Sequence, residues 1–429
     1  MPEPLRRVAV IGSARIPFAR SNTSYAEVGN LGMLTAALAA LSGRFGLDHA
    51  AIGEVAAGAV IRHPSDWNLT REAALGAGLS PQTPAYDVQR ACGTSLTATV
   101  QIARRIALGE IEAGVAGGAD TASDVPIGYG RALSAIALAS ARGRTLGGRI
   151  KPWLRLRPAD LRPATPGVVE PRTGLSMGEH CEQMAKQWRI ARSDQDELAY
   201  RSHMNAAAAW RDGFYQDLVV AFAGLDRDNN VRPDTTPAKL AALQPVYDKS
   251  GGGTLTAGNS TPLTDGAACV LLASDAWAQA HGSPVQAYLT HWGVAAVDFV
   301  GISGPAEGLL MAPAYAVPAM LDRAGLKLQD FDVYEIHEAF AAQVLCTLAA
   351  WESDDYCRDR LKRDRALGAI DRERLNPRGG SVALGHPFAA TGARIVGTLA
   401  SELEARGAGR GLISICTAGG MGVTAILER

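Results

Sequence analysis

The sequence lacks an excess of charge of either sign, because 42 basic and 43 acidic side chains leave a formal net charge of −1. Nucleic-acid-binding domains need a basic footprint, so we expect no nucleic-acid partner. Cysteine is also scarce, with six in 429 residues and no C-x-x-C pair. This scarcity excludes a disulfide scaffold and provides no zinc-ligand spacing, so no metal site is expected.

Long apolar runs are missing as well. No stretch of about 18 uncharged apolar residues occurs, so we expect no transmembrane span. The N-terminal run MPEPLRRVAVIG is too short for the apolar core of a signal peptide. No Walker A pattern occurs, and glycine clusters alone are weak indicators of a phosphate site. Together with lone, reduced cysteines, these absences favour a cytoplasmic protein.

The composition that remains, with 47% hydrophobic residues, is that of a globular α/β protein. Its length indicates two or three domains, or one large duplicated unit. A helix is expected at Leu31–Leu41 and another after Cys92. Apolar runs predict strands at Val8–Gly12, Glu54–Ile61, Pro84–Val88, Val115–Gly118, Val285–Gly293, Val333–Ile336, Gly380–Leu384, Leu412–Cys416 and Val423–Leu427. This alternation predicts a largely parallel, covered sheet, and its repetition in both halves hints at a duplication.

Segment 126–253 differs from the rest of the chain. Within it, residues 142–172 hold eight basic and two acidic side chains and are rich in proline and glycine. We interpret this stretch as an excursion from the core. It is either an anion site, membrane surface or partner face, or an ordinary solvated surface, and the residues alone leave both interpretations open.

Cys92 follows a predicted strand and precedes a predicted helix. A thiol at a helix N-terminus faces unpaired N–H groups and the positive end of the helix dipole, which favour the nucleophilic thiolate. Gly93 beside it allows a substrate to approach closely. A lone buried cysteine that only packs is the alternative.

Two histidines are expected in similar places. His386 lies in Gly385-His386-Pro387 on a predicted strand-to-helix turn, where α/β proteins bind ligands. Its titration range suits a base that activates a thiol. His337 follows the predicted strand Val333–Ile336. A loop hydrogen bond for His386 and a helix cap for His337 are the structural alternatives.

Cys416 ends an apolar run and is followed by Thr417-Ala418-Gly419-Gly420, a turn whose N–H groups can face a ligand. A buried cysteine before a hairpin is the alternative. Taken together, a cysteine and a histidine make a nucleophile and its base, and a second cysteine adds an acid/base. This combination points to acyl transfer between thioesters.

With these residues identified, the sequence resembles the thiolase family over essentially its whole length. The motifs that carry the resemblance keep the family's order and spacing, and they are Cys92-Gly-Thr-Ser, Ala257-Gly-Asn-Ser-Thr ahead of Asp265-Gly-Ala-Ala, His337-Glu-Ala-Phe, Gly385-His-Pro-Phe-Ala-Ala-Thr-Gly and Cys416-Thr-Ala-Gly-Gly. The resemblance implies a duplicated five-layer αβαβα fold. Its expected parts are an N-terminal half (1–125, completed by 254–275), an inserted loop domain (126–253) and a C-terminal half (276–429).

The resemblance also implies residue roles. Cys92 would carry the acyl group, His386 would activate it, and Cys416 would be the second acid/base. The main-chain N–H groups of Cys92 and Ala418 would form one oxyanion hole, and His386 with His337 the other. No cofactor is implied, because coenzyme A is a substrate.

Contacts to coenzyme A are expected elsewhere in the chain. Met177 would form a wall for the pantetheine or acyl arm, and Gly258 and Thr261 would lie in the binding loop. Arginines of segment 126–253 would face the phosphates. The implied reaction is the reversible, coenzyme A-dependent cleavage of 3-oxoacyl-CoA to acetyl-CoA and a shortened acyl-CoA, as in fatty acid β-oxidation.

One position departs from most thiolases, which have Asn where His337 stands. The histidine is similar to the thiolase subunit of fatty-oxidation multienzyme complexes, the trifunctional-protein β type. That branch implies broad or longer-chain substrates, with an acetoacetyl-CoA-specific enzyme as the alternative. It also implies a homodimer or tetramer, a hydratase/3-hydroxyacyl-CoA dehydrogenase partner subunit, and peripheral membrane contact through 126–172.

Two other functions fit parts of the pattern. A decarboxylating 3-oxoacyl synthase of the same superfamily would use Cys92, His337 and His386, but it has no need of Cys416. An inert thiolase-like lipid carrier would be expected to lose part of this set. The presence of all four residues favours a thiolase over both.

Overall fold

The computed structural model describes residues 5–49, 52–167 and 169–429. Its strands are β1 (Ala9–Arg15), β2 (Ala19–Arg20), β3 (Glu54–Ala57), β4 (Ala85–Asp87), β5 (Ala113–Asp120), β6 (Gly128–Tyr129), β7 (Pro163–Ala164), β8 (Thr264–Ala273), β9 (Ala287–Ala296), β10 (Val333–Ile336), β11 (Arg410–Thr417) and β12 (Met421–Glu428). Every strand expected from the sequence overlaps one of these, apart from Gly380–Leu384.

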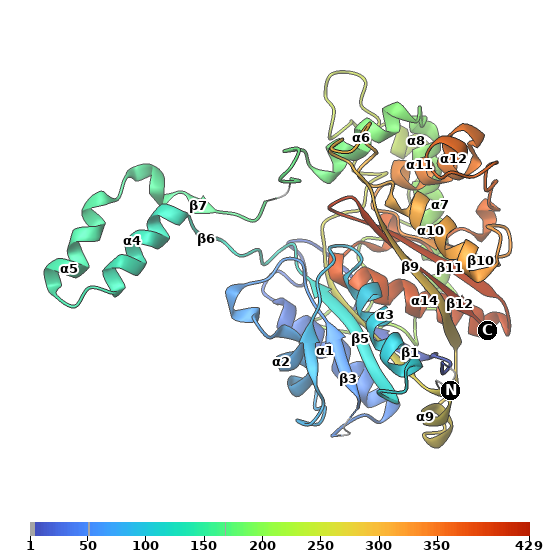
Figure 1. Cartoon of the computed structure of the whole chain (residues 1–429), viewed down its shortest axis with the longest axis horizontal. Helices are drawn as coiled ribbons and strands as arrows, with labels where there is room; N and C mark the ends of the chain where they lie inside the picture. Colours follow the sequence, from blue (N-terminus) through green and yellow to red (C-terminus); the bar gives the residue numbers. More distant parts are fainter. Residues whose placement is uncertain (1–4, 50–51, 168) are drawn as a thin grey trace.

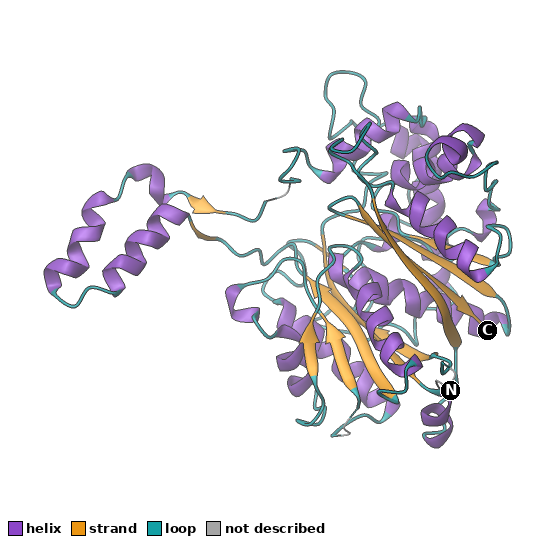
Figure 2. Ribbon diagram, in the orientation of Figure 1, coloured by secondary structure: helices purple, strands orange, loops and turns teal. Residues whose placement is uncertain are grey.

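Helices surround the strands (Figure 2). The α-helices are α1 (Asn30–Phe45), α2 (Leu69–Gly76), α3 (Thr94–Ala107), α4 (Arg131–Ala141), α5 (Leu146–Ile150), α6 (Met177–Gln187), α7 (Arg192–Arg211), α8 (Pro237–Ala241), α9 (Asp275–Ala280), α10 (Ala312–Ala324), α11 (Ala341–Glu352), α12 (Asp354–Asp359), α13 (Ser381–Leu384) and α14 (Thr391–Arg406). Short 3-10 helices are η1 (Pro64–Asp66), η2 (Lys151–Arg155), η3 (Pro158–Leu161), η4 (Arg372–Arg374) and η5 (Phe388–Ala390). The helix expected at Leu31–Leu41 is confirmed as part of α1.

The main sheet has the strand order β10-β11-β12-β9-β1-β8-β5-β3-β4, with β2 paired to β8. The expectation of a largely parallel sheet is wrong. Only the pairs β10/β11, β3/β4 and β3/β5 are parallel, whereas β1, β8, β9 and β12 pair antiparallel with their neighbours. A continuous hydrophobic run indicates that a strand is buried on both faces, but it does not indicate whether the neighbouring strand is parallel or antiparallel. The error arose because burial was taken as a sign of parallel pairing.

Five layers follow from the way strand side chains alternate. In β8, Cys269 and Leu271 face a core shared with α1, while Val270 and Leu272 face a core shared with α3 and α14. That second core also contains Ile413 of β11, whereas Leu412 faces a third core with α10 and α11. The layers are therefore outer helices, one half of the sheet, α3 with α14, the other half of the sheet, and outer helices. This confirms the expected five-layer αβαβα fold.

The segment Gly380–Leu384 is α13, a single helical turn, so the expectation of a strand here is wrong. Short apolar runs do not distinguish a strand from a buried helix. The turn sends Val382 into a cluster with Ala199 of α7, and Leu384 into another with Ala209 of the same helix. His386 therefore follows a helix and not a strand.

Residues 126–167 form an arm that extends away from the rest of the molecule (Figure 1). The pair β6/β7 forms its base, and α4, α5, η2 and η3 lie beyond that base. Helices α6 and α7 return to pack on the second half, where Met184 and Leu198 join its cores. Among the helices described, none has the length and apolar character needed to cross a membrane.

Candidate active site

Cys92 lies on a tight turn just before α3. Ala91 has φ +42°, an uncommon value for a residue with a side chain, and the hydroxyl of Thr94 holds the turn. That hydroxyl donates to the Ala91 carbonyl at 2.7 Å and accepts from the Arg90 N–H at 2.9 Å. A Cβ atom on Gly93 would lie 2.9 Å from both Thr417 and Val423, so this glycine lets the β11–β12 hairpin pack directly against the turn.

Desolvation is the largest influence on the pKa of Cys92, although the residue is only half-buried. Desolvation raises the pKa of the thiol to about 12, although hydrogen bonds from the main chain at Ala418 and at Cys92 itself act in the opposite direction. The expectation that a helix N-terminus favours the thiolate is therefore wrong for the free enzyme. Desolvation of the charged form outweighs the helix end, because the helix cap is Gly93 and the sulfur stands outside the helix.

His337 is placed by the parallel pairing of β10 with β11. Its N–H donates to the Ser414 carbonyl at 2.8 Å, which continues the ladder by one residue beyond Ile336. Because parallel strands end on the same side of a sheet, His337 and Cys416 reach the same edge. The imidazole is almost completely buried, with 1% of its surface exposed.

His386 is placed by a turn between α13 and η5. Gly385 has φ +102°, a value that side-chain-bearing residues rarely adopt, and this allows the reversal. After the histidine, the Ala389 N–H donates to the Asp120 carboxylate at 2.7 Å. That carboxylate also accepts from the N–H groups of Val60 and Ile61, so the turn is tied to the first half of the molecule.

These three side chains meet although they are far apart in the sequence. The rings of His337 and His386 have centroids 4.2 Å apart. One ligand-type atom from each histidine and the sulfur of Cys92 all lie within 4.8 Å of one another. The sequence-based expectation that these residues share one site is consistent with this geometry.

The hydrogen bonds of His386 indicate its tautomer. Nδ1 lies 2.5 Å from the hydroxyl oxygen of Thr391, and that hydroxyl donates its own proton to the Pro387 carbonyl at 3.1 Å. We therefore assign the proton to Nδ1, which gives it to Thr391, and this assignment leaves Nε2 as a bare acceptor. Burial and the charge of Arg394 lower the pKa of His386 to about 3, so the ring is neutral at pH 7.

His337 has the opposite arrangement. Its Nδ1 lies 2.9 Å from the hydroxyl of Ser381, and Arg394 donates to the same oxygen at 2.8 Å. Because arginine can only donate, the proton of Ser381 is free to be given to Nδ1, and on this basis we assign the proton of His337 to Nε2. Burial, His386 and Arg394 hold the pKa of His337 well below its usual value. His337 is therefore a neutral hydrogen-bond donor beside a neutral base.

Cys416 stands near the end of β11, opposite Gly422 of β12, with Gly419 and Gly420 in left-handed conformations at the hairpin. Its thiol pKa is raised well above the usual range by burial and by the nearby Cys92. It is thus a neutral proton donor close to the nucleophile. The N–H of Ala418 points at the Cys92 sulfur, where an oxyanion hole was expected.

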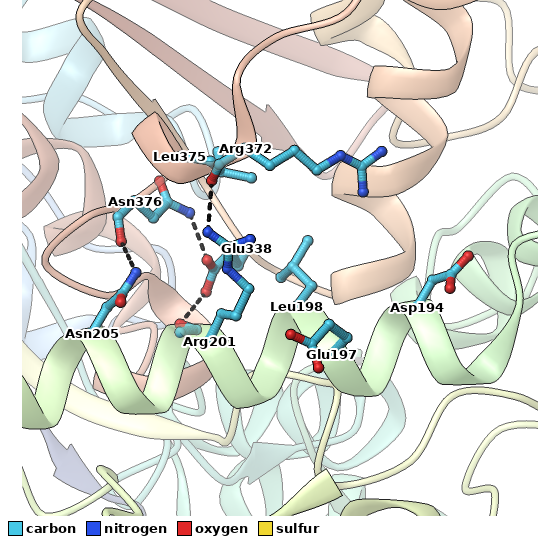
Figure 3. A pocket seen from close by; sticks show the side chains of 10 residues that line it. Asp194, Glu197, Leu198, Arg201, Asn205, Glu338, Arg372, Leu375 and Asn376 are labelled. Atoms are coloured by element: carbon cyan, nitrogen blue, oxygen red, sulfur yellow. Dashed lines mark hydrogen bonds between the residues drawn. The ribbon is translucent and has the colours of Figure 1, made fainter.

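A polar cavity of about 120 Å³ lies beside this cluster, between α7 and the segment Arg372–Asn376 (Figure 3). None of the four expected catalytic side chains lines it. Its wall is the buried Glu338, which accepts from Ser202 at 2.7 Å and from Asn376 at 2.6 Å. The same carboxylate accepts from the Val382 N–H at 3.2 Å. The cavity therefore lies next to the hydrogen bonds of Glu338 that hold the His337 loop, and it is not the reaction site.

The three residues expected to contact coenzyme A all make contacts within the chain, and these contacts do not test the expected role. Met177 is the first residue of α6 and packs against the core that contains Cys416. Gly258 lies against Leu240 and Leu243, which leave no room for a Cβ atom. Thr261 donates to the Ser381 carbonyl at 2.7 Å and so braces the turn that orients His337. Their contact with coenzyme A stays a prediction.

Sequence reasoning missed the residues that orient the two histidines. Thr391 lay unremarked within the motif around His386, and Ser381 lay within the predicted strand Gly380–Leu384. Arg394 carried no signal at all, yet it is buried with Glu335, whose oxygen lies 3.6 Å from its guanidinium. A hydroxyl five residues from a histidine, as in His386 and Thr391, is the one clue that the sequence offered.

Comparison with known proteins agrees with this site. The thiolase N-terminal domain matches residues 8–276, and the thiolase C-terminal domain matches residues 285–429. The 3-ketoacyl-CoA thiolase of Photorhabdus laumondii is 42% identical over 98% of this chain and 97% of its own. That of Pectobacterium carotovorum is 44% identical over 98% and 96%.

A solved structure leads to the same family. The crystal structure of the Bacillus anthracis acetyl-CoA acetyltransferase superposes with a TM-score of 0.81 at 30% identity, covering 99% of each chain. Since the two domain matches together span nearly the whole sequence, the chain belongs to the thiolase family.

Proposed function

We propose that this thiolase cleaves 3-oxoacyl-CoA with coenzyme A, reversibly, to acetyl-CoA and a shortened acyl-CoA, through an acyl group on Cys92. The observation that carries the proposal is the meeting of Cys92, His337 and His386 within 4.8 Å, with Cys416 beside them. The 3-ketoacyl-CoA thiolases at 42–44% identity support it. As a thiolase, the protein is an acyltransferase.

In the first half-reaction, the sulfur of Cys92 attacks carbon 3 of the substrate. Because both the thiol and the imidazole are neutral in the free enzyme, the Cys92 proton passes to Nε2 of His386 as the S–C bond forms. The C2–C3 bond then breaks. Its electron pair leaves as the enolate of acetyl-CoA, and Cys416 protonates carbon 2.

Two donors receive the enolate oxygen. His337 presents its Nε2–H from the start, and His386 presents a second Nε2–H once it has taken the proton of Cys92. Preorganised donors of this kind typically supply ~3–4 kcal/mol each to a developing oxyanion. The N–H groups of Cys92 and Ala418 form the second oxyanion hole, for the acyl oxygen on Cys92.

In the second half-reaction, coenzyme A enters and gives its thiol proton to the Cys416 thiolate. Its sulfur attacks the acyl carbon, the bond to Cys92 breaks, and the proton held by His386 returns to the Cys92 sulfur. The product is the shortened acyl-CoA. Every group regains its starting protonation, so the cycle closes without a further reactant.

The alternatives are less well supported. A decarboxylating synthase obtains its carbanion from the loss of carbon dioxide and has no use for the buried thiol of Cys416. An inert lipid carrier has no need of two histidines held in opposite tautomers. The named relatives favour neither alternative.

The wider context extends this proposal. Thiolases use acyl-CoA and coenzyme A and usually form oligomers. For this chain, a homodimer or tetramer, broad or longer-chain substrates, a hydratase/3-hydroxyacyl-CoA dehydrogenase partner and the three-part division at residues 125 and 253 stay proposals. All six cysteines are free thiols, and this supports a cytoplasmic location.

The arm supports a contact role for residues 126–172. Leu146 and Leu154 are 77% and 80% exposed, among basic side chains such as Arg149 and Arg155. Exposed leucines with arginines suit the surface of an anionic membrane. Sedimentation with anionic but not neutral phospholipid vesicles, lost in a Leu146→Ser, Leu154→Ser double variant, would support this contact. Equal sedimentation of variant and parent would remove it.

The reaction is tested by incubating the protein with coenzyme A and 3-oxoacyl-CoA substrates of short and long chain. We expect acetyl-CoA and the shortened acyl-CoA in equal amounts. Faster cleavage of long chains supports the multienzyme-type preference, whereas activity on acetoacetyl-CoA alone supports the narrower enzyme. Carbon dioxide release from malonyl thioesters without cleavage would replace the proposal with the synthase.

A further inference from the structure

The three side chains that meet at the reaction centre also have the composition of a transition-metal site. Within the described part of the chain, Cys92, His337 and His386 are the one group of three metal-ligating side chains whose ligand atoms converge. One thiolate and two imidazoles suit Zn²⁺ and other borderline metals. Sequence spacing gave no sign of this, because the three ligands come from three separate loops.

The ligand atoms are available as well as close. Nε2 of His337 and Nε2 of His386 are both buried and have no hydrogen-bond partner in the described residues. Buried polar atoms are normally paired, so two unpaired nitrogens beside one sulfur can each accept a ligand. During catalysis a proton or a substrate oxygen occupies these positions. In their absence a cation can bind the two nitrogens.

The surroundings of both rings match what a metal-bound histidine needs. Such histidines usually hold their second ring nitrogen on a hydrogen-bonding partner that fixes the ring. Thr391 does this for His386, and Ser381 does it for His337, since a hydroxyl can accept as well as donate. The rings are thus oriented before any metal arrives. The charge of Arg394 opposes a cation, and Glu335, 3.6 Å away, offsets that charge when its carboxyl, whose pKa burial raises to about 8, is ionised.

The distances are compatible with binding after a small adjustment. In a tetrahedral site with Zn–N and Zn–S bonds of ordinary length, neighbouring ligand atoms lie about 3.3–3.7 Å apart. The three atoms here lie within 4.8 Å of one another, so each side chain needs to move by less than the length of a bond. Three protein ligands leave the fourth position to water.

We propose that Cys92, His337 and His386 form a Zn²⁺ site, in which the metal reversibly blocks the nucleophile and its base. On binding, the thiol proton passes to solvent and the proton of His337 moves from Nε2 to Nδ1, where Ser381 accepts it. A Zn–S bond and two Zn–N bonds form, and no electron is transferred. Zinc coordination occupies Nε2 of both histidines, so the bound metal removes the base and the hydrogen-bond donor that acylation of Cys92 uses in the proposed reaction. Metal binding itself does not depend on the proposed reaction, whereas the block of nucleophile and base rests on the proposed function.

The test uses the full-length protein, reduced, treated with EDTA and desalted, and titrated with Zn²⁺ against a chromogenic chelator. We expect one Zn²⁺ per chain, and an affinity at least about tenfold lower in His337→Asn. His281→Asn is the matched control, because His281 is exposed and stacks on Trp277 away from the cluster. Its affinity should equal that of the parent.

A second measurement identifies the sulfur ligand. Co²⁺ should give a thiolate-to-metal charge-transfer band in the parent, and alkylation of Cys92 with iodoacetamide should abolish it. Circular dichroism verifies that each variant is folded. If His337→Asn does not fold, the alkylated parent takes its place as the protein that lacks a ligand. Failure of the parent to hold Zn²⁺ overturns the proposal. So does retention of the parent's affinity in folded His337→Asn or in the alkylated protein.

Discussion

The ring centroids of His337 and His386 lie 4.2 Å apart, yet the hydroxyls beside their Nδ1 atoms have opposite roles. One hydroxyl accepts a hydrogen bond from its histidine, and the other donates a hydrogen bond to its histidine. Thr391 has given its proton to a carbonyl and accepts from His386. Ser381 accepts from Arg394 and has its proton left for His337. The same side chain type is thus held as a base in one position and as a donor in the next.

Replacing Thr391 with valine should remove the acceptor that keeps the proton of His386 on Nδ1. The ring can then place its proton on Nε2, where it cannot take the proton of Cys92. We expect kcat to fall about 10- to 100-fold, since general base catalysis typically contributes 10²–10⁴-fold. Steady-state cleavage of 3-oxoacyl-CoA measures this. Thr391→Ser keeps the hydroxyl and should retain most activity, and equal losses in both variants would contradict the assignment.

Replacing Ser381 with alanine should release His337 from its donor tautomer and remove the hydrogen bond from Arg394 to the Ser381 hydroxyl. A buried hydrogen bond of this kind is worth about 1–3 kcal/mol, so we expect kcat to fall about tenfold or more. Nitrogen-15 NMR of the histidines should show His337 shifting from the Nε2–H form. Ser414→Ala is the control, because the hydroxyl of Ser414 is also buried but has no partner in the described residues. An unchanged tautomer in Ser381→Ala would refute the relay.

Replacing Cys416 with alanine should remove the acid that protonates the acetyl-CoA enolate. We expect cleavage of 3-oxoacyl-CoA to fall at least about 100-fold, because proton transfer to the leaving carbon has no other donor in place. Cys357→Ala is the control, since this buried thiol donates to the α11 carbonyls of Ala350 and Trp351. Cleavage near the parent rate in Cys416→Ala would contradict the role of Cys416 as this acid.

The reactivity of Cys92 towards iodoacetamide should rise steadily with pH. Its raised pKa, about 12, means that the thiolate fraction grows about tenfold per pH unit from pH 6 to pH 9 without a plateau. His386, with its pKa lowered to about 3, stays neutral over that range and adds no step. Peptide mapping follows the rate at Cys92 specifically. A plateau below pH 7 would reveal a preformed thiolate–imidazolium pair.

Much of the site could be read from the sequence. Cys92, His337 and Cys416 lie at or just after the ends of predicted strands. His337 and Cys416 reach one edge of the sheet because adjacent β10 and β11 run parallel, whereas Cys92 comes from β4 at the far end of the strand order. The strand Val333–Ile336 has the bounds that its apolar run predicted. Such features depend on local pattern, which a sequence shows directly.

What the sequence could not show depends on tertiary contacts. Gly380–Leu384 has the apolar run of a strand, but α7 supplies two separate clusters that a helical turn fills better. The thiol pKa of Cys92 was misjudged because a helix end is visible in the sequence, whereas the depth of burial is not. The tautomers required knowing which hydroxyl faces each ring, and Ser381 and Thr391 have no local pattern that reveals this.

The central claim is that Cys92 carries the acyl group, and intact mass measurement tests it most directly. The reduced protein is mixed with acetyl-CoA, quenched in acid and weighed, and the adduct is mapped by peptide. We predict one acetyl group, on Cys92, that free coenzyme A removes and that is absent in Cys92→Ser. An adduct on another residue, or none on folded protein with free thiols, would contradict the account.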